Sequence, residues 1–424
     1  MATKTIADIN VAGKAVLMRV DFNVPVADGK ITNDKRIKAA LPAIEKVIDG
    51  GGKLILMSHL GRPDGKYDPE GSLKCCAERL AKLLGRPVKL GPSDVAGQEA
   101  QKMASKLKAG EVLMLENVRF NPGETMPDKA KSLHDPQGGK NPDGGLTAEQ
   151  KKVHEDFIAQ LAGMGDVYVN DAFGTCHRKH ASMYGVAQAI KAKGGPAVAG
   201  FLVEKEIKYL NEAVAGARRP FVAILGGVKV SDKIKLISTL LGKVDKILIG
   251  GAMAYTLLKA RGASVGRSLV EENQVAAMKE LLGKAGDKIV LPSDHIAADE
   301  FESDQARRID DVNIPDGLVG MDIGPRTAKA FGAVIASGKT IVWNGPMGVF
   351  EREAYAAGTK AIAQAVAEAT DAGAISVIGG GDSAAAVEQM GLEERMTHVS
   401  TGGGASLTYL EGKAMPAIEV LDQK

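Results

Sequence analysis

The sequence predicts an α/β protein made of two doubly wound, Rossmann-like domains with mostly parallel sheets, joined by a helix and separated by a cleft. Short apolar runs alternate with helix-like runs along the chain, as expected for helices packed on both faces of a parallel sheet. With 424 residues the chain is too long for one ordinary core. Its 51 glycines suit many tight strand-to-helix turns.

The first domain is predicted from four apolar strands, at 15–20, 54–57, 112–115 and 167–169. Polar residues follow each strand: Asp21, Asn23 and Arg36 after the first, His59 and Arg62 after the second, Arg119 after the third, and His177 and Arg178 after the fourth. Ligands of such sheets bind beyond the carboxyl ends of the strands. Because arginine suits carboxylate and phosphate oxygens, we expect a basic pocket for a small anion there.

The middle of the chain breaks this rhythm twice. Residues 121–152 are rich in Pro, Gly, Lys and Asp, and we interpret them as a long surface loop or insertion without chemistry. Residues 191–200 form a second break, and 201–214 have helical spacing of apolar residues. The predicted organisation is therefore a first domain at 1–190, a connection at 191–214 and a second domain at 215–407.

The second domain is predicted from strands at 221–225, 246–249, 288–291, 340–343, 375–378 and 397–400. Glycine turns follow several of them, and two triple-glycine turns, 379–381 and 402–404, each lead into a helix-like run. Glycines allow close backbone approach, and helix N-termini attract phosphate. The chain lacks a P-loop motif and a suitably placed dinucleotide fingerprint, so a different nucleotide site is expected.

Charged residues at these turns fit a phosphate chain. Lys229 and Lys233 are four residues apart, so both ammonium groups would share a face if a helix begins at that turn. Asp382 directly follows the 379–381 turn, and Mg²⁺ usually takes one or two carboxylates plus phosphate oxygens.

Composition narrows the class of partner. The formal net charge is +2, so no global field draws the chain to nucleic acid or membrane, and we expect small-molecule substrates. The three cysteines lack metal-site spacing, and neither a signal peptide nor an apolar stretch of membrane-spanning length occurs, which favours a reducing cytoplasm. A dinucleotide-dependent oxidoreductase and a non-catalytic nucleotide-binding protein are the alternatives. The first needs the missing fingerprint, and the second has no use for an arginine-rich edge.

Taken together, the motifs resemble the phosphoglycerate kinase family. The matching stretches occur in family order over nearly the whole chain: RVDFNVP (19–25), SHLGRP (58–63), ENVRF (116–120), VNDAFGTCHR (169–178), LGGVKVSDK (225–233), GGAMAY (250–255), MDIGP (321–325), VWNGPMGVFE (342–351), GGGDS (379–383) and STGGGASL (400–407). The resemblance implies reversible phosphoryl transfer between 1,3-bisphosphoglycerate and ADP, giving 3-phosphoglycerate and ATP with Mg²⁺, by hinge closure.

The resemblance also implies roles for individual residues. On the first domain, substrate contacts would come from Asp21, Phe22, Asn23, Arg36, His59, Leu60, Gly61, Arg62, Arg119 and Arg178. On the second, nucleotide contacts would come from Gly226, Gly227, Lys233, Gly250, Gly320, Asn344, Glu351, Gly380, Gly381, Asp382 and Ser383. Catalytic roles would fall to Arg36, Lys229 and Gly403, with Asp382 on the metal.

The resemblance further implies a monomer whose tail, about 408–424, packs back on the first domain. Four features depart from the common family pattern: Ser383 replaces Thr, Val228 replaces Ala, Thr408 replaces Glu, and the 121–152 segment is longer than usual. None involves the residues expected to carry the chemistry.

Overall fold

The computed structural model of the chain describes residues 2–128, 145–214 and 216–424. Contacts between Cα atoms divide it into two units, Met1–Ile207 with Ala414–Lys424, and Lys208–Lys413. The division falls inside helix α7 (Phe201–Val214), so one continuous helix belongs partly to each unit. Each unit contains one parallel sheet of six strands, which confirms the predicted fold class.

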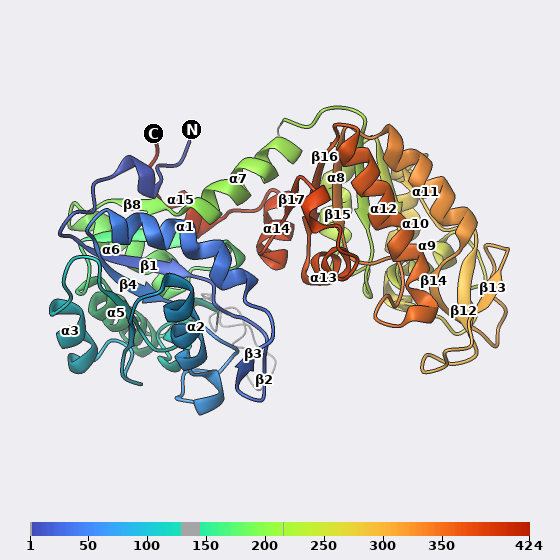
Figure 1. Cartoon of the computed structure of the whole chain (residues 1–424). Helices are drawn as coiled ribbons and strands as arrows, with labels where there is room; N and C mark the ends of the chain where they lie inside the picture. Colours follow the sequence, from blue (N-terminus) through green and yellow to red (C-terminus); the bar gives the residue numbers. More distant parts are fainter. Residues whose placement is uncertain (1, 129–144, 215) are drawn as a thin grey trace. The chain divides into compact units, whose positions relative to one another are not determined.

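The first unit has the sheet order β5-β6-β4-β1-β7-β8, with every pair parallel (Figure 1). Its strands are β1 (Ala15–Val20), β4 (Lys53–Met57), β5 (Val88–Leu90), β6 (Val112–Met114), β7 (Val167–Asp171) and β8 (Ala197–Ala199). Its helices are α1 (Lys35–Asp49), α2 (Lys74–Leu84), α3 (Gln98–Ser105), α5 (Ala148–Ala162), α6 (Val186–Ala192) and α15 (Pro416–Glu419). A small hairpin pairs β2 (Val26–Ala27) with β3 (Lys30–Ile31).

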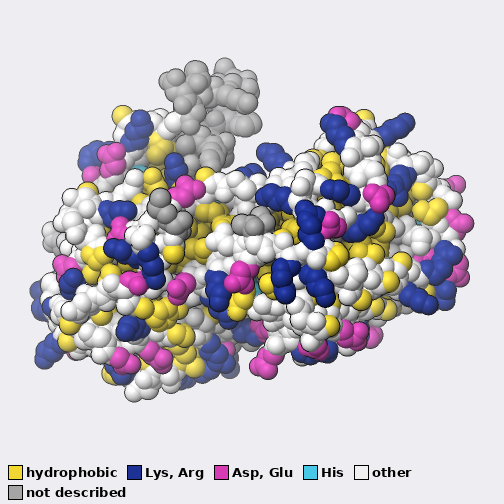
Figure 2. All heavy atoms as spheres, turned by 90° about the horizontal axis from the view of Figure 1, so that it is seen from above, with side chains coloured by type: hydrophobic (Ala, Val, Ile, Leu, Met, Phe, Trp, Pro, Cys, Tyr) yellow, Lys and Arg dark blue, Asp and Glu magenta, His cyan; other side chains and the backbone are white. Residues whose placement is uncertain are grey.

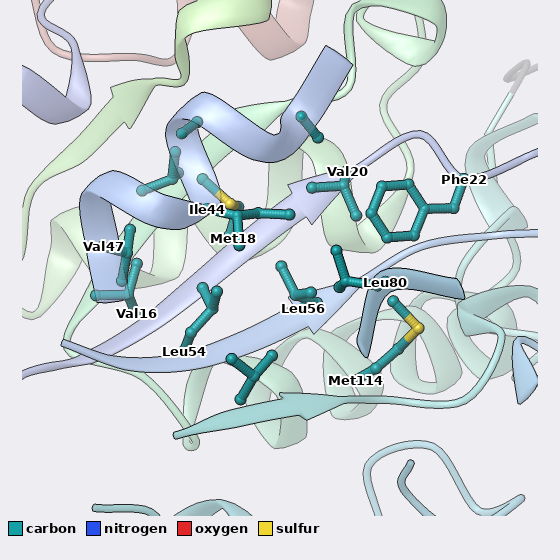
Figure 3. Close-up of a cluster of buried hydrophobic side chains, with 14 of the residues drawn as sticks. Val16, Met18, Val20, Phe22, Ile44, Val47, Leu54, Leu56, Leu80 and Met114 are labelled. Carbon is teal, nitrogen blue, oxygen red and sulfur yellow. The ribbon is translucent and has the colours of Figure 1, made fainter. Parts of the chain in front are cut away.

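The alternation of side chains along the strands explains how this sheet is covered. Val16 and Met18 of β1 pack in one buried cluster with Ile44 of α1 and Leu80 of α2 (Figure 3). Tyr168 of β7 points to the other face, where its hydroxyl donates to the carbonyl oxygens of residues 182 and 183. Helices therefore bury both faces, which is why the strands are almost continuously apolar.

Three details of the first unit differ from the sequence interpretation. The 191–200 break contains β8, which pairs with β7 and completes the sheet edge despite its small side chains. The expected loop at 121–152 ends earlier, because α5 begins at Ala148 with a capping box from Thr147. Residues 129–144 of that expected loop lie outside the described residues. Strand β5, which the sequence analysis did not predict, is short and only partly buried.

The second unit has the sheet order β11-β10-β9-β15-β16-β17, again with every pair parallel. Its strands are β9 (Phe221–Leu225), β10 (Lys246–Ile249), β11 (Ile289–Val290), β15 (Thr340–Asn344), β16 (Ile375–Gly379) and β17 (His398–Val399). Its helices are α8 (Ile234–Leu241), α9 (Met253–Ala260), α10 (Val275–Ala285), α11 (Pro325–Ser337), α12 (Ala357–Asp371), α13 (Gly381–Gln389) and α14 (Gly403–Leu410). In chain order this is the Rossmann arrangement 3-2-1-4-5-6, in which ligands bind where the strand order reverses.

The same unit carries an antiparallel sheet that the sequence analysis missed. Its order is β13-β12-β14, from β12 (His295–Ala298), β13 (Arg307–Ile309) and β14 (Val319–Ile323). Strand β13 is largely exposed and charged, so it lacks the apolar run that marked the other strands. Among the described helices, none combines the length and apolarity needed to cross a membrane.

The C-terminal tail is built into the first unit. The amide nitrogen of Ala197 in β8 donates to the Asp422 carboxylate at 3.0 Å, and Asn170 Nδ2 donates to the carbonyl of Ala417 at 2.9 Å. A bridge also pairs Thr3 with Gln423. The tail that belongs to this unit begins at Ala414, because α14 lies in the second unit up to Leu410.

Candidate functional site

The first unit contains a basic cavity of about 280 Å³ near the carboxyl ends of its strands. It is lined by Arg62, Asp64, Gly65, Arg119, Thr125, Asp128, Arg178 and His180. Three of the arginines that we predicted from different strand ends thus converge on one cavity. On the face seen in Figure 2, cationic and anionic side chains are interspersed.

Arg119 is held with its guanidinium turned toward this cavity. It lies in a short 3-10 turn after β6, η3 (Val118–Phe120), and its Nη1 donates to the carbonyl of Gly61 at 2.8 Å. Its Nε is buried without a hydrogen-bond partner. Burial and the neighbouring charge of Arg19 lower the pKa of Arg119. An anion in the cavity would satisfy that donor and relieve the repulsion between cations.

A second polar group follows β1. Asp21 accepts a hydrogen bond from Arg36 Nη1 at 3.0 Å, which ties the start of α1 to the strand end. Arg36 therefore lies in the first turn of α1. Asn23 Oδ1 accepts from the amide nitrogen of Gly61 at 2.9 Å, which links the first two strand-end loops.

His59 lies beside a buried arginine. Its Nδ1 is 3.1 Å from Nη2 of Arg19, and both side chains are almost completely buried. Because arginine only donates hydrogen bonds, Nδ1 must accept and the proton of the neutral ring sits on Nε2. Burial, followed by the charges of Arg19, Arg119 and other neighbouring cations, holds the pKa of His59 well below its usual range. His59 is thus a neutral hydrogen-bond donor near neutral pH.

The side chains of two predicted substrate-binding residues, Phe22 and Leu60, are buried. The Phe22 ring and the Leu60 side chain belong to the buried apolar cluster on the α1 and α2 side of the sheet (Figure 3). The Phe22 amide nitrogen donates to Ser58 Oγ, and the Leu60 carbonyl accepts from Asn117. These bonds connect the loop after β4 to the loops after β1 and β6.

Sequence reasoning missed several polar residues around the cavity. His180 and Asp128 line it, and Arg19 is a buried charge inside a strand. Arg19 Nε donates to Ser182 Oγ, and Ser182 in turn donates to Glu124, which is fully buried. An arginine within an apolar strand is a usable signal, because a buried charge needs a partner. Asp128 and Glu124 lie in the segment to which we assigned no chemistry.

In the second unit the two triple-glycine turns are in direct contact. A Cβ on Gly403 would come within 2.9 Å of the Cα of Gly380. Gly380 has a φ of 97°, a left-handed value that favours glycine, and α13 and α14 begin at these turns. The two helix N-termini therefore lie together, which doubles the number of backbone N–H groups available to an anion.

Other predicted glycines are filled by the protein itself. A Cβ on Gly226 would lie 2.0 Å from the carbonyl oxygen of Pro346, and one on Gly250 would lie 2.6 Å from the sulfur of Met347. A Cβ on Gly320 would collide with the Tyr255 ring. These positions need glycine for packing, whereas Gly381 has no atom within 4 Å of such a Cβ. Gly227 has a φ of 109° and leaves room beside Lys233.

Lys233 is the central cation of this unit. Its Nζ donates to Asn344 Oδ1 at the end of β15, and only 9% of the residue is exposed. Burial lowers the pKa of Lys233 to about 8, against the opposing charges of Asp382 and Asp232. Asn344 Nδ2 is buried without a hydrogen-bond partner beside the Gly380 turn. A cation and an unpaired donor at this turn are both suited to phosphate oxygens.

The remaining predicted residues surround this turn in different ways. Ser383 is buried, and its Oγ accepts from the amide nitrogen of Gly345 at 2.5 Å, so the hydroxyl holds two loops together. Asp382, in the first turn of α13, is exposed, as is Glu351.

The prediction that Lys229 and Lys233 share a helix face is wrong. Helix α8 begins only at Ile234, and Lys229 is exposed whereas Lys233 is buried.

An arginine-lined anion cavity in one Rossmann-like unit and paired glycine turns around a buried lysine in the other define a two-domain α/β kinase. The sequence model of the phosphoglycerate kinase family matches residues 6–413. The chain belongs to that family. It is an enzyme of glycolysis that transfers a phosphoryl group reversibly between 1,3-bisphosphoglycerate and ADP, giving 3-phosphoglycerate and ATP.

Individual relatives agree over the full length. The chain is 53% identical over 428 residues to phosphoglycerate kinase of Rhodopirellula baltica, with 100% of both chains covered. It is 51% identical over 425 residues to that of Chloroherpeton thalassium, with 99% of each covered. The phosphoglycerate kinase structure from Coxiella burnetii matches with a TM-score of 0.82 at 39% identity, covering 99% of this chain and 98% of that one.

Proposed function

We propose that 3-phosphoglycerate binds to the first unit with its phosphate in the basic cavity. The observation that carries this proposal is the convergence of Arg62, Arg119 and Arg178 on one small cavity, with an unpaired Nε on Arg119. Charge-assisted hydrogen bonds from guanidinium groups are strong and suit a phosphate. The hydroxyl and carboxyl end of the substrate then lies toward Asp21, Asn23 and Arg36.

On the second unit, the proposed nucleotide site is the pair of glycine turns with Lys233 and Asn344. Among the residues that the structure describes, no group of three or more His, Cys, Asp and Glu side chains is arranged to hold a metal. The exposed carboxylate of Asp382, in the first turn of α13, fits Mg²⁺ that arrives with ATP or ADP and keeps its phosphate oxygens and waters as ligands. The ion would neutralise charge on the phosphates.

Phosphoryl transfer needs the two substrates in line and shielded from water. Because each unit holds one substrate, we propose that the units close on each other, with Arg36, Lys229 and Gly403 around the moving group. Strand β8 (Ala197–Ala199) lies within the 191–200 break and pairs with β7 in the first sheet, so this break does not suit a hinge. We place the hinge instead at helix α7 and before Ala414, where the chain passes between units, together with the Gly402–Gly404 turn. A cytoplasmic monomer completes the proposal.

A coupled assay of ATP consumption with 3-phosphoglycerate tests this site assignment. Arg119→Ala should mainly raise the KM for 3-phosphoglycerate, by the equivalent of about 1.5–3 kcal/mol for one lost charge-assisted hydrogen bond. Asp382→Ala should weaken the response to Mg²⁺ and nucleotide and leave 3-phosphoglycerate binding nearly intact. Unchanged 3-phosphoglycerate affinity in the first variant, or an unchanged Mg²⁺ titration in the second, would refute the corresponding half of the assignment.

A further inference from the structure

One carboxylate of the chain already occupies the basic cavity. Asp128 Oδ2 accepts hydrogen bonds from Arg178 Nη1 at 3.1 Å and from His180 Nε2 at 2.8 Å. Arg178 and His180 come from one loop, 50 or more residues away from Asp128 in sequence. Two of the groups that line the cavity are thus bound to an anion supplied by the protein.

The ion group is partly buried and ionised. The His180 side chain is only 2% exposed and that of Asp128 29% exposed, so water screens these contacts less than it screens a surface ion pair. Burial alone would raise the pKa of Asp128, but the hydrogen bond and charge of His180, with the charge of Arg178, lower it to about 2. Asp128 therefore carries its full negative charge throughout the neutral range.

The position of Asp128 is fixed by the chain just before it. The Glu124 carboxylate accepts from both the amide nitrogen and the hydroxyl of Ser182, at 2.8 and 2.7 Å. The amide nitrogen of Ala181 donates to the Glu124 carbonyl at 3.0 Å, and that of Asp128 donates to the Thr125 carbonyl at 3.0 Å. These bonds hold the turn against the segment after His180, so the contact of Asp128 with Arg178 and His180 is preorganised.

From this geometry we infer that Asp128 is an internal counter-anion, which the phosphate of the substrate displaces from Arg178 and His180. The inference rests on the proposed function of the cavity. A phosphate that took the same two donors would lie within a few ångströms of the Asp128 carboxylate, where like charges repel strongly in a partly dry site. Asp128 thereby sets the affinity of the cavity for anions, and it holds Arg178 and His180 in position while the cavity is empty.

The proposal distinguishes Asp128 from the other carboxylate of the cavity. Asp64 also lines the cavity, but its backbone φ of 51° places it in a tight turn, and no ion pair joins it to an arginine among the described residues. Asp64→Asn removes one negative charge from the same cavity but leaves the hydrogen bonds of Asp128 with Arg178 and His180 in place. Because asparagine tolerates a left-handed backbone, this variant is a matched control for the local field.

The test compares the full-length enzyme with Asp128→Asn, Asp128→Ala and Asp64→Asn. Titration calorimetry gives the Kd of inorganic phosphate and of 3-phosphoglycerate at fixed ionic strength. Both Asp128 variants should bind each ligand about tenfold more tightly, and Asp64→Asn less than about threefold, as expected from coupling between groups in contact. In the coupled assay the KM for 3-phosphoglycerate should fall without a rise in kcat. The alanine variant removes any new hydrogen bond from the asparagine amide.

The outcomes separate this inference from the assignment on which it rests. If the wild-type enzyme binds 3-phosphoglycerate but the Asp128 variants bind it equally or more weakly, Asp128 only positions its partners and the inference is overturned. If the affinity for phosphate rises as much in Asp64→Asn as in the Asp128 variants, the effect comes from the general electrostatic field of the cavity. The inferred displacement of Asp128 by phosphate would then be overturned. If the wild-type cavity binds neither ligand, and Arg119→Ala changes nothing, the assignment of the cavity fails as well.

Discussion

Lys233 shows how burial tunes one side chain for a charged ligand. Its ammonium group lies under the Gly227 turn, hydrogen-bonded to Asn344, and burial brings its pKa to about 8. The pKa is low because burial removes the charged ammonium group from water. The neighbouring carboxylates offset this effect only in part. A phosphate placed beside it would favour the charged form. The free site is therefore prepared for an anion in a way that an exposed lysine is not.

Nucleotide binding should consequently take up a proton at Lys233. At pH 8 about half of the free enzyme has this lysine neutral, and bound phosphates raise its pKa, so uptake approaches about half a proton per site. Calorimetry of ADP binding in two buffers with different ionisation enthalpies measures the uptake. In Lys233→Arg the guanidinium stays charged and the uptake should vanish. Identical uptake in both enzymes would contradict this role for Lys233.

The glycines at strand-to-helix turns of the second unit are of two kinds. Gly226 is surrounded by the backbone of the loop after β15, so its missing side chain serves packing between strands β9 and β15. Gly381 opens α13 with empty space beside it. A sequence shows both kinds as the same letter in the same kind of turn, and only the neighbouring loop distinguishes them.

Alanine at these two positions should therefore have opposite consequences. In Gly226→Ala the new Cβ meets the carbonyl oxygen of Pro346, and forcing the two backbones apart should cost about 1–3 kcal/mol of folding stability. Gly381→Ala should keep or raise stability, by about 0.5–1 kcal/mol, because alanine suits a helix better than glycine. It should instead raise the KM for ATP, where the nucleotide needs the open space. Thermal melting and the coupled assay measure the two effects, and a destabilised Gly381→Ala with normal KM would reverse this interpretation.

The sequence predicted the fully buried apolar strands well and missed strands made of small or exposed residues. The apolar strands β1, β9 and β10 begin and end where their hydrophobic runs do, because full burial leaves a clear signal. Strands β8 and β13 were missed, since one is built from small residues at an edge and the other is charged and exposed. The strand-end polar residues of the first unit were predicted from the expected strand topology, and three of them, Arg62, Arg119 and Arg178, line one cavity.

What topology could not provide is the partner of each polar side chain. The contact between Asp128 and Arg178 joins residues 50 positions apart, and it depends on a turn whose composition suggested only a loop. The pairing of Arg19 with His59 likewise depends on two strands lying side by side in register. Such contacts arise from packing between elements, which hydrophobic periodicity does not encode.

In the proposed assignment the substrate groups lie before residue 208 and the nucleotide groups after it, and the tail from Ala414 belongs to the first unit. The proposed reaction therefore depends on a movement that brings Arg36 to Lys229. Arg36 is half-buried and pairs with the buried Asp21 in the first unit, and Lys229 is exposed in the second.

If the units close during the reaction, two linked results are expected, one for the kcat of variants and one for the radius of gyration. Because Arg36 and Lys229 would act together on charge that develops during transfer, Arg36→Ala and Lys229→Ala should each lower kcat far more than they raise KM. The double variant should lose less than the product of the two single losses, since both serve one charge. Small-angle scattering should give a smaller radius of gyration with both substrates than with either alone. Normal kcat in both single variants, together with a particle of constant size, would exclude transfer by closure.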